Sequence, residues 1–449
     1  MIEIMRLSPN DGYLEMEINR ERVEMTVFLR ETERMFKRVE HQIVRPGVVK
    51  ISGFENLRDY EVYVRENGSG EESSRRLFKC GKTPGRVINY IHPKDKTYYP
   101  SGDSPASPSI VKCSDGRLIV SHDIFAGGCA QNLSKVFFSD DQGNSWNYLS
   151  EIYPCFWGKL FIHRDVLYML GNSHEYGDLL LFKSDDFGKS WHKPEIVLRG
   201  GNRITGGPHK GPMPITEHKG RLWTAVDYGS WTVGEHRSGV ISVRSDCDIS
   251  DPENWISSSS FLPYDPQWEG TAKGETIGLL EGNVVVKPDG SLVNFLRYQT
   301  NLCEPNFGKA IYLYVDDEKP ASELRFGKVV DFPGNLSKFS IYYDERTQKY
   351  WSLVSRGDAV NPGRRNELIL LSSVNLDDWE VERVVLDYEH NGWHEDRDKV
   401  GFQYVDFIFD QEDILLVSRT GINGARSFHD ANYITFHRIE NYSGSAKDR

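Results

Sequence analysis

The chain has 449 residues, which is enough for two or three domains. Hydrophobic residues make up 38% and charged residues 27%, which favours a packed core and argues against wholesale disorder. The 54 basic and 66 acidic residues give a net charge of −12, which argues against a nucleic-acid-binding protein and against attachment to anionic membranes by bulk charge. Forty glycines and an aromatic content of 12% favour short strands and tight turns over long helices.

No run of about 18 apolar residues is present, so the sequence predicts no membrane-spanning helix. The N-terminal stretch MIEIMRLSPNDGYLEMEINR has no apolar segment of the signal-peptide type, so we expect a cytoplasmic protein unless a leader has been removed. The six cysteines are far apart and form no CxxC pair. This spacing argues against a disulfide framework or a zinc ribbon and predicts free, mostly buried thiols.

Residues 1–85 are predicted to form a separate module. Within it, residues 47–68 (GVVKISGFENLRDYEVYVRENG) alternate apolar and polar side chains around a central turn. This segment resembles the end of a fibronectin-III-like sandwich, in which a tyrosine-bearing strand follows a leucine turn. A charged helix over residues 18–38 is the alternative for part of the module.

Residues 108–437 repeat loosely, and each unit contains four strand-like segments. The first unit reads SPSIVKC, RLIVSHDIF, SKVFFSDD and SWNYLSEI. Six such units follow one another, and the sixth lacks its fourth segment. The stretch RVINYIHP at residues 86–93 is the natural donor of that strand, which would close a ring without exposed sheet edges. The sequence therefore predicts an all-β chain with a six-bladed β-propeller over residues 86–449; a seventh blade would have to come from the N-terminal module.

Two units carry the same octet, at residues 139–146 and 184–191, and both match S-x-D-x-G-x-S-W. The Ser and Asp side chains can accept amide hydrogens of a turn, Gly permits a positive φ, and Trp can pack between blades. The octets resemble the Asp boxes of the sialidase superfamily. We interpret them as structural and assign their aspartates no catalytic role.

The octets also orient the units, because they lie at the turns between the third and fourth segments. The opposite face receives the ends of the second segments and the starts of the first and third, and function concentrates in loops on one face of a rigid scaffold. Five of the 13 histidines and many arginines fall there, which suits a carboxylate-bearing substrate in this acidic protein. The predicted substrate-binding residues of this face are Trp157, Glu281, Asn283, Arg297, Arg356, Arg365, Arg419 and His429.

A closer resemblance covers roughly residues 86–440. The strings SPSIVKCSDGRLIVSHD, EGNVVVKPDG, KVGFQYVDFIF and FHDANYITFHRI look like those of sialidase-like propellers that include ulvan lyases and enzymes acting on rhamnose–glucuronate linkages. That group is described with seven blades, from which the count of six departs. The resemblance implies histidine and tyrosine as acid and base, here His122, His174 and Tyr228, with an arginine for the uronate. His209 is the next candidate base, and a buried, structural His122 is the alternative interpretation.

The resulting hypothesis is an enzyme that cleaves an acidic, uronate-containing oligosaccharide, with β-elimination as the favoured chemistry. Arginine would neutralise the carboxylate, histidine would take the α-proton, and tyrosine would protonate the leaving oxygen. Sialidases proper carry an arginine in an F/Y-R-I-P motif, which is missing here, where the first segment begins Ser107-Pro108.

Two alternatives remain open: a glycoside hydrolase of sialidase or rhamnosidase type, and a propeller that binds glycan or protein without catalysis. A hydrolase could use a Tyr298–Glu281 nucleophile pair, or two carboxylates. We expect no cofactor, although a structural metal at Asp246-Cys247-Asp248 is the alternative. We expect neither a nucleic acid nor a membrane as a partner, and the oligomeric state stays open. The carboxylates available to a hydrolase are Asp123, Glu175, Asp227 and Glu281.

Overall fold

The computed structural model describes residues 1–21, 24–357, 360–389, 393 and 396–444. In this part of the chain the regular structure is β-strand, apart from two short 3-10 helices at Pro252–Asn254 and Arg397–Lys399. None of these described helices is long and apolar enough to cross a bilayer. The six cysteines are free and four of them are buried, which confirms the prediction made from their spacing.

Residues 4–79 form a sandwich of two four-stranded sheets, with strand orders β1-β2-β6-β5 and β4-β3-β7-β8. Apolar side chains of both sheets, such as Met16 and Val62, pack into one cluster, in the arrangement of a fibronectin-III- or immunoglobulin-like sandwich. The helix considered for residues 18–38 is wrong, because strand β3 occupies that region. The strands are β1 (Ile4–Pro9), β2 (Tyr13–Ile18), β3 (Met25–Glu31), β4 (Lys37–Val39), β5 (Gln42–Arg45), β6 (Val48–Ser52), β7 (Asp59–Glu66) and β8 (Arg76–Lys79).

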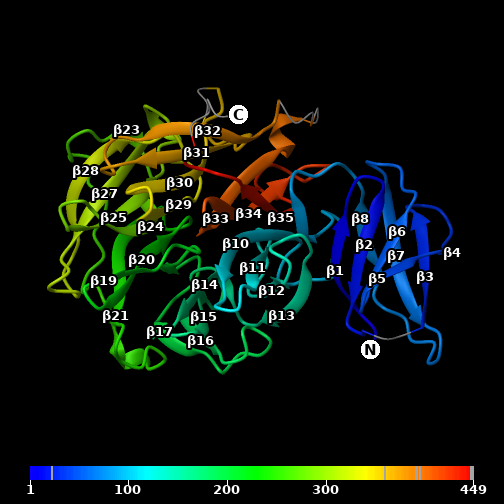
Figure 1. Ribbon diagram of the computed structural model, residues 1–449. Coiled ribbons are helices and arrows are strands. Elements are labelled where there is room, and N and C mark those ends of the chain that lie inside the picture. Colours follow the sequence, from blue (N-terminus) through cyan, green and yellow to red (C-terminus); the bar gives the residue numbers. More distant parts are fainter. Residues whose placement is uncertain (22–23, 358–359, 390–392, 394–395, 445–449) are drawn as a thin grey trace.

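Six further sheets follow over residues 86–439 of the described chain, and we number them 1 to 6 in chain order. Figure 1 shows them arranged around a common centre beside the sandwich, as in a β-propeller. Sheets 1 to 3 contain β10 (Ser104–Lys112), β11 (Leu118–Phe125), β12 (Ser134–Ser139) and β13 (Asn147–Ile152); β14 (Phe156–His163), β15 (Val166–Asn172), β16 (Leu179–Ser184) and β17 (Glu195–Leu198); and β18 (Gly207–His209), β19 (Thr216–His218), β20 (Arg221–Ser230), β21 (Glu235–Arg244) and β22 (Trp255–Ser257).

Sheets 4 to 6 have the same antiparallel, neighbour-to-neighbour order, and the strand pair β23 (Lys273–Glu275) and β26 (Leu302–Glu304) lies outside them. The first strands of the sheets contact one another, as β10 does with β14 and β33, so these strands are innermost. Sheets 4 to 6 contain β24 (Leu279–Val286), β25 (Leu292–Tyr298), β27 (Lys309–Val315) and β28 (Arg325–Asp331); β29 (Ser340–Asp344), β30 (Lys349–Ser355), β31 (Glu367–Ser373) and β32 (Glu380–Asp387); and β33 (Gly401–Asp410), β34 (Asp413–Gly421), β35 (Tyr433–Ile439) and β9 (Arg86–Tyr90).

The ring is closed by a strand from the beginning of the propeller. Strand β9 pairs antiparallel with β35, with Tyr90 opposite Tyr433, and becomes the fourth strand of sheet 6. This confirms the predicted strand donor, and the pairing satisfies an edge that would otherwise be open.

The two octets form the turns that their residue types predict. Ser139 Oγ accepts the Gly143 amide at 2.8 Å, and Asp141 Oδ1 accepts the Ser145 amide at 2.8 Å. The second octet repeats these bonds, with Ser184 accepting Gly188 N at 2.7 Å. Trp146 is 1% exposed and packs against Phe436 of sheet 6, which joins two sheets of the ring.

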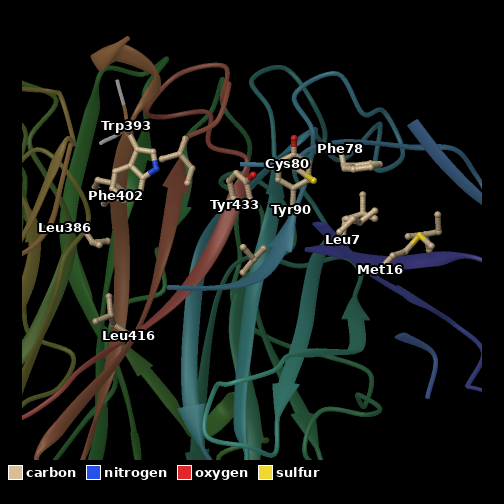
Figure 2. Close-up of a cluster of buried hydrophobic side chains, with 14 of the residues drawn as sticks. Leu7, Met16, Phe78, Cys80, Tyr90, Leu386, Trp393, Phe402, Leu416 and Tyr433 are labelled. Carbon is tan, nitrogen blue, oxygen red and sulfur yellow. The ribbon is translucent and has the colours of Figure 1, made fainter. Parts of the chain in front are cut away.

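The sandwich and the propeller share one apolar core. Figure 2 shows Leu7, Met16 and Phe78 of the sandwich continuing through Tyr90 and Tyr433 into the interior of sheet 6. Because the cluster is continuous, the sandwich braces the sheet that closes the ring.

Candidate active site

Four innermost strands contain a β-bulge at the same height. Each bulge breaks the alternation of the strand and holds a non-glycine residue at positive φ, a conformation that is uncommon in strands and is concentrated at functional sites. The side chains at all four bulges line one cavity of about 470 Å³ on the central axis. The bulge residues are Ser107 (φ 46°), Trp157 (φ 55°), Glu281 (φ 50°) and Tyr404 (φ 55°).

Aspartates at the ends of second strands hold two of these bulges in place. Asp123 Oδ2 accepts the Trp157 amide at 2.8 Å, and Asp227 Oδ1 accepts the Glu281 amide at 3.1 Å. Burial raises the pKa of Asp123 to about 7, although its hydrogen-bond donors oppose this. Asp123 and Asp227 therefore fix the backbone of the next sheet and do not face the cavity, unlike Glu281.

Tyr404 and Glu281 form a hydrogen-bonded pair in the lining of the cavity. The Tyr404 hydroxyl donates to Glu281 Oε1 at 2.7 Å, and Arg297 Nη1 contacts Glu281 Oε2 at 2.8 Å. Burial alone would raise the pKa of Glu281, but Arg297, His209 and Tyr404 outweigh it and lower that pKa. Burial and the Glu281 charge raise the pKa of Tyr404 to about 12. A neutral phenol thus donates to an ionised carboxylate that can take its proton.

Two more guanidinium groups lie over the same tyrosine ring. The Cζ atoms of Arg365 and Arg419 are 5.6 and 5.5 Å from the centroid of the Tyr404 ring, and both arginines are at least nine-tenths buried. Within the described residues neither forms an ion pair, and the Nε atom of each has no hydrogen-bond partner. Burial, together with the neighbouring Arg297 and Arg419, lowers the pKa of Arg365 to about 9. Such uncompensated buried cations suit a carboxylate ligand.

A second carboxylic acid lines the cavity from sheet 2. Glu175 follows β15 and lies 3.7 Å from Arg203, measured from Oε2 to Nη1. Burial raises the pKa of Glu175, while Arg203 and His209 oppose that rise. The pKa values of Glu175 and Glu281 are therefore displaced in opposite directions, which is the arrangement expected of a proton donor and a proton acceptor.

His209 and His236 share one carboxylate at the edge of the cavity. Their Nδ1 atoms lie 2.9 and 2.7 Å from Asp227 Oδ2. Burial disfavours the charged form of His209, but Asp227 outweighs it and raises the pKa, whereas burial lowers the pKa of His236. In the described part of the chain these three residues are the group whose ligand atoms, within 4.8 Å of one another, could hold a metal ion. The Asp246-Cys247-Asp248 segment does not form such a group in the described residues, and Asp246 pairs instead with Arg244 at 2.6 Å.

Seven of the twelve predicted site residues line the cavity. They come from five of the six sheets, so the inner strands and the loops at one end of the sheets meet at a single cavity. The seven residues are Trp157, His209, Glu281, Arg297, Arg365, Arg419 and His429.

His122 does not face the cavity, contrary to the role of substrate-facing base. It is fully buried, with Nε2 3.0 Å from Asn89 Nδ2 and Nδ1 3.0 Å from the Asp123 carbonyl oxygen. Burial lowers its pKa to about 3, so the imidazole is neutral. Its ring stacks on Phe137. This is the position expected from the alternative interpretation, in which His122 is a buried, structural histidine.

Three other predicted residues also lie outside the cavity lining. His174 Nδ1 lies 3.0 Å from the Glu175 carbonyl oxygen, and Tyr228 packs against Phe261. Arg356 pairs with Glu367 at 2.9 Å in a separate groove.

Asn283 and Tyr298 are structural. Asn283 is buried and accepts the Ile341 amide at 2.9 Å, so it joins two inner strands. Tyr298 bonds to Tyr264 at 2.6 Å and does not contact Glu281. The tyrosine partner of Glu281 is Tyr404, which corrects the Tyr298–Glu281 pair.

Tyr404, Arg203 and Trp231 are absent from the predicted site residues, although all three line the cavity. Tyr404 follows Gln403 at the start of an inner strand, a position that the orientation of the octets already marks as facing the site. Arg203 and Trp231 lie in connections without a repeat, so no periodic signal identifies them.

The fold is similar to that of solved carbohydrate-active enzymes, among them a sialidase and an α-L-arabinofuranosidase. "Hadza microbial sialidase Hz136" matches with a TM-score of 0.53 and 13% identity, over 98% of this chain and 94% of that chain. A mutant of the α-L-arabinofuranosidase arb93a from Fusarium graminearum, in complex with an iminosugar inhibitor, matches with a TM-score of 0.51 and 12% identity, over 80% of this chain and 98% of that one. At these identities the likeness shows the fold alone, which is that of a sialidase-type β-propeller. No family model and no curated protein matches the sequence.

Proposed function

We propose that the protein is a retaining glycoside hydrolase that releases a terminal, carboxylate-bearing sugar from an oligosaccharide. The observation that carries the proposal is the Tyr404–Glu281 hydrogen bond of 2.7 Å beside three buried arginines. Arg365 and Arg419 would bind the substrate carboxylate, since they lack an anionic partner among the described residues.

In the first step, the Tyr404 oxygen attacks the anomeric carbon and Glu281 takes the phenolic proton. Glu175 gives its proton to the glycosidic oxygen, the bond between that oxygen and the anomeric carbon breaks, and the leaving sugar departs as an alcohol. Tyrosine serves as the nucleophile in sialidases. A neutral nucleophile also avoids the charge repulsion that a carboxylate would meet from an anionic sugar.

In the second step, a water molecule gives its proton to Glu175 and attacks the same carbon. The bond to Tyr404 breaks, and Glu281 returns its proton to the tyrosine. Two inversions give net retention, and both carboxyl groups end in their starting protonation states.

The cavity suits a terminal sugar because the axis beneath it is filled. Two residues beyond the bulges of Trp157 and Tyr404, Lys159 Nζ and Asp406 Oδ2 form a buried ion pair at 2.6 Å. Lys338 Nζ donates to the Val405 carbonyl oxygen at 2.8 Å in the same layer. The substrate therefore enters from one side, and about 470 Å³ lies within the range of roughly 300–1,000 Å³ for small-molecule sites.

Uronate β-elimination is the second candidate, and the His209–Asp227 pair favours it. An imidazole held by a carboxylate can act as a base, and Tyr404 in the same cavity could protonate the leaving oxygen. The raised pKa of His209 weakens this candidate, because a protonated imidazole accepts no proton.

One experiment separates the two reactions. Umbelliferyl glycosides of N-acetylneuraminate, glucuronate and galacturonate, together with disaccharides in which a sugar is linked to O4 of a uronate, would be incubated with the protein. Released umbelliferone and the ultraviolet absorbance of unsaturated uronate would be recorded together. We expect hydrolysis, and a fluorinated glycosyl fluoride should leave a covalent adduct on Tyr404 that peptide mass spectrometry locates. Elimination products would support the second candidate. No turnover of any acidic glycoside would contradict both.

A further inference from the structure

The cavity is lined by two chemically different groups of residues. Sheets 4 to 6 contribute Arg297, Arg365, Arg419 and the Tyr404–Glu281 pair. Sheets 2 and 3 contribute Glu175, Arg203 and Trp231 from the segments that follow β15, β17 and β20. The carboxylate-binding groups and the nucleophile thus lie on one wall, and the proton donor with an aromatic side chain lies on the other.

Trp231 is held in place although its ring is open to solvent. Trp231 is 41% exposed, whereas Trp157 and Tyr176, the aromatic residues packed around this wall, are buried. The Trp231 amide donates to the Tyr176 hydroxyl at 3.2 Å. The indole ring lies edge-on to His236, with centroids 5.9 Å apart.

The hairpin that carries Trp231 is fixed to the neighbouring loop. Ser230 Oγ donates to the Arg203 carbonyl oxygen at 2.7 Å and accepts the Val233 amide at 3.0 Å. Tyr176, which anchors the Trp231 backbone, directly follows Glu175 in the chain. These bonds place the open indole on the same wall as the proposed proton donor.

We infer that Trp231 is the stacking platform for the leaving sugar, the ring next to the bond that is cleaved. This inference rests on the proposed function, since it takes Glu175 as the group that protonates the glycosidic oxygen. The leaving sugar must lie on the side of the bond that receives the proton, and that is the Trp231 wall. Sugar rings have apolar faces of C–H groups, and an exposed, pre-oriented indole binds such a face with little loss of conformational freedom.

The inference fixes the class of substrate more narrowly. The enzyme would act on an acidic sugar linked to a neutral sugar ring. The leaving ring needs no carboxylate of its own, because the cation on this wall, Arg203, already faces the Glu175 carboxylate. Arg203 is half-exposed and can donate to hydroxyl groups at the edge of the leaving ring.

The test measures binding, so that it does not depend on turnover. In the Tyr404→Phe background, calorimetry would give Kd for 3′-sialyllactose and for a glucuronate-terminated disaccharide, and for free N-acetylneuraminate and glucuronate. For an oligosaccharide that binds, we expect Trp231→Ala to raise Kd about tenfold, equivalent to about 1.4 kcal/mol, and to leave Kd of its free acidic sugar unchanged. Trp231→Phe should recover part of the loss. Tyr343→Ala is the matched control, since Tyr343 is 38% exposed at the opposite end of an inner strand.

The outcomes distinguish the stacking role of Trp231 from the proposed hydrolase activity. Equal effects of Trp231→Ala on oligosaccharide and monosaccharide, or no effect on either, would overturn the stacking role. Oligosaccharide binding that depends on Trp231, in a wild-type protein that turns over no glycoside, would keep the subsite and reject the hydrolase. No binding of any of these probes would reject both.

Discussion

Replacing Arg203 by glutamine should move the alkaline limb of the pH–rate profile upward. Glu175 must be protonated to act as a general acid, so kcat/KM falls as pH rises through the pKa of Glu175. The Arg203 cation, 3.7 Å away, favours the ionised form, and its removal raises that pKa. Because the Arg203 side chain is 50% exposed, the dielectric constant of water applies, and the pair is worth about 1.1 kcal/mol, or about 0.8 pH unit.

The assay is kcat/KM on one umbelliferyl glycoside from pH 4 to 9, for wild type and variant. Arg199→Gln is the control, because Arg199 lies on the same loop as Arg203, pairs with Asp178 and lines no part of the cavity. We expect its profile to match the wild type. An alkaline limb that stays in place or moves downward in Arg203→Gln would refute Glu175 as the proton donor, whatever the height of the plateau.

Four further outcomes are expected. Glu175→Gln should lower kcat about 10²–10⁴-fold on disaccharides and far less on substrates with a phenolic leaving group, which needs little protonation; equal losses on both would contradict the role. Arg365→Met should raise KM for acidic glycosides and leave KM for the corresponding methyl esters nearly unchanged, as initial rates would show. Trp146→Ala should cost about 3–5 kcal/mol in urea unfolding while folded protein keeps its kcat, because the ring is buried between sheets 1 and 6. His122→Ala should lower the free energy of unfolding and leave the pH–rate profile unchanged, since the neutral imidazole only packs and forms hydrogen bonds. Loss of the acidic limb of the pH–rate profile in this variant would instead indicate that His122 acts as a base.

Much of the fold follows from local sequence features. The alternation of side chains marks the strands, and the bonds of the S-x-D-x-G-x-S-W turn are made within eight residues, as between Ser139 and Gly143. The strand at residues 86–93 could be identified because the last repeat lacks one segment, and β9 fills that place. The same octets indicated which end of the sheets carries the site, and seven predicted residues lie there.

The pairing of site residues could not be derived from the sequence, because it depends on contacts between different sheets. Glu281 and Tyr404 are 123 positions apart and meet because inner strands of different sheets converge on one axis. A bulge with positive φ turns each of these side chains toward that axis, and period-two alternation does not predict a bulge. For His122 the sequence predicted a residue at the cavity, but the tertiary structure buries it. Its strand end packs against Asn89 of β9, the strand that closes the ring. The sequence by itself determined the strands, their turns and the functional end of the propeller; only the tertiary structure decided which side chains face the cavity, since that depends on the bulges and on the packing of sheets remote in sequence.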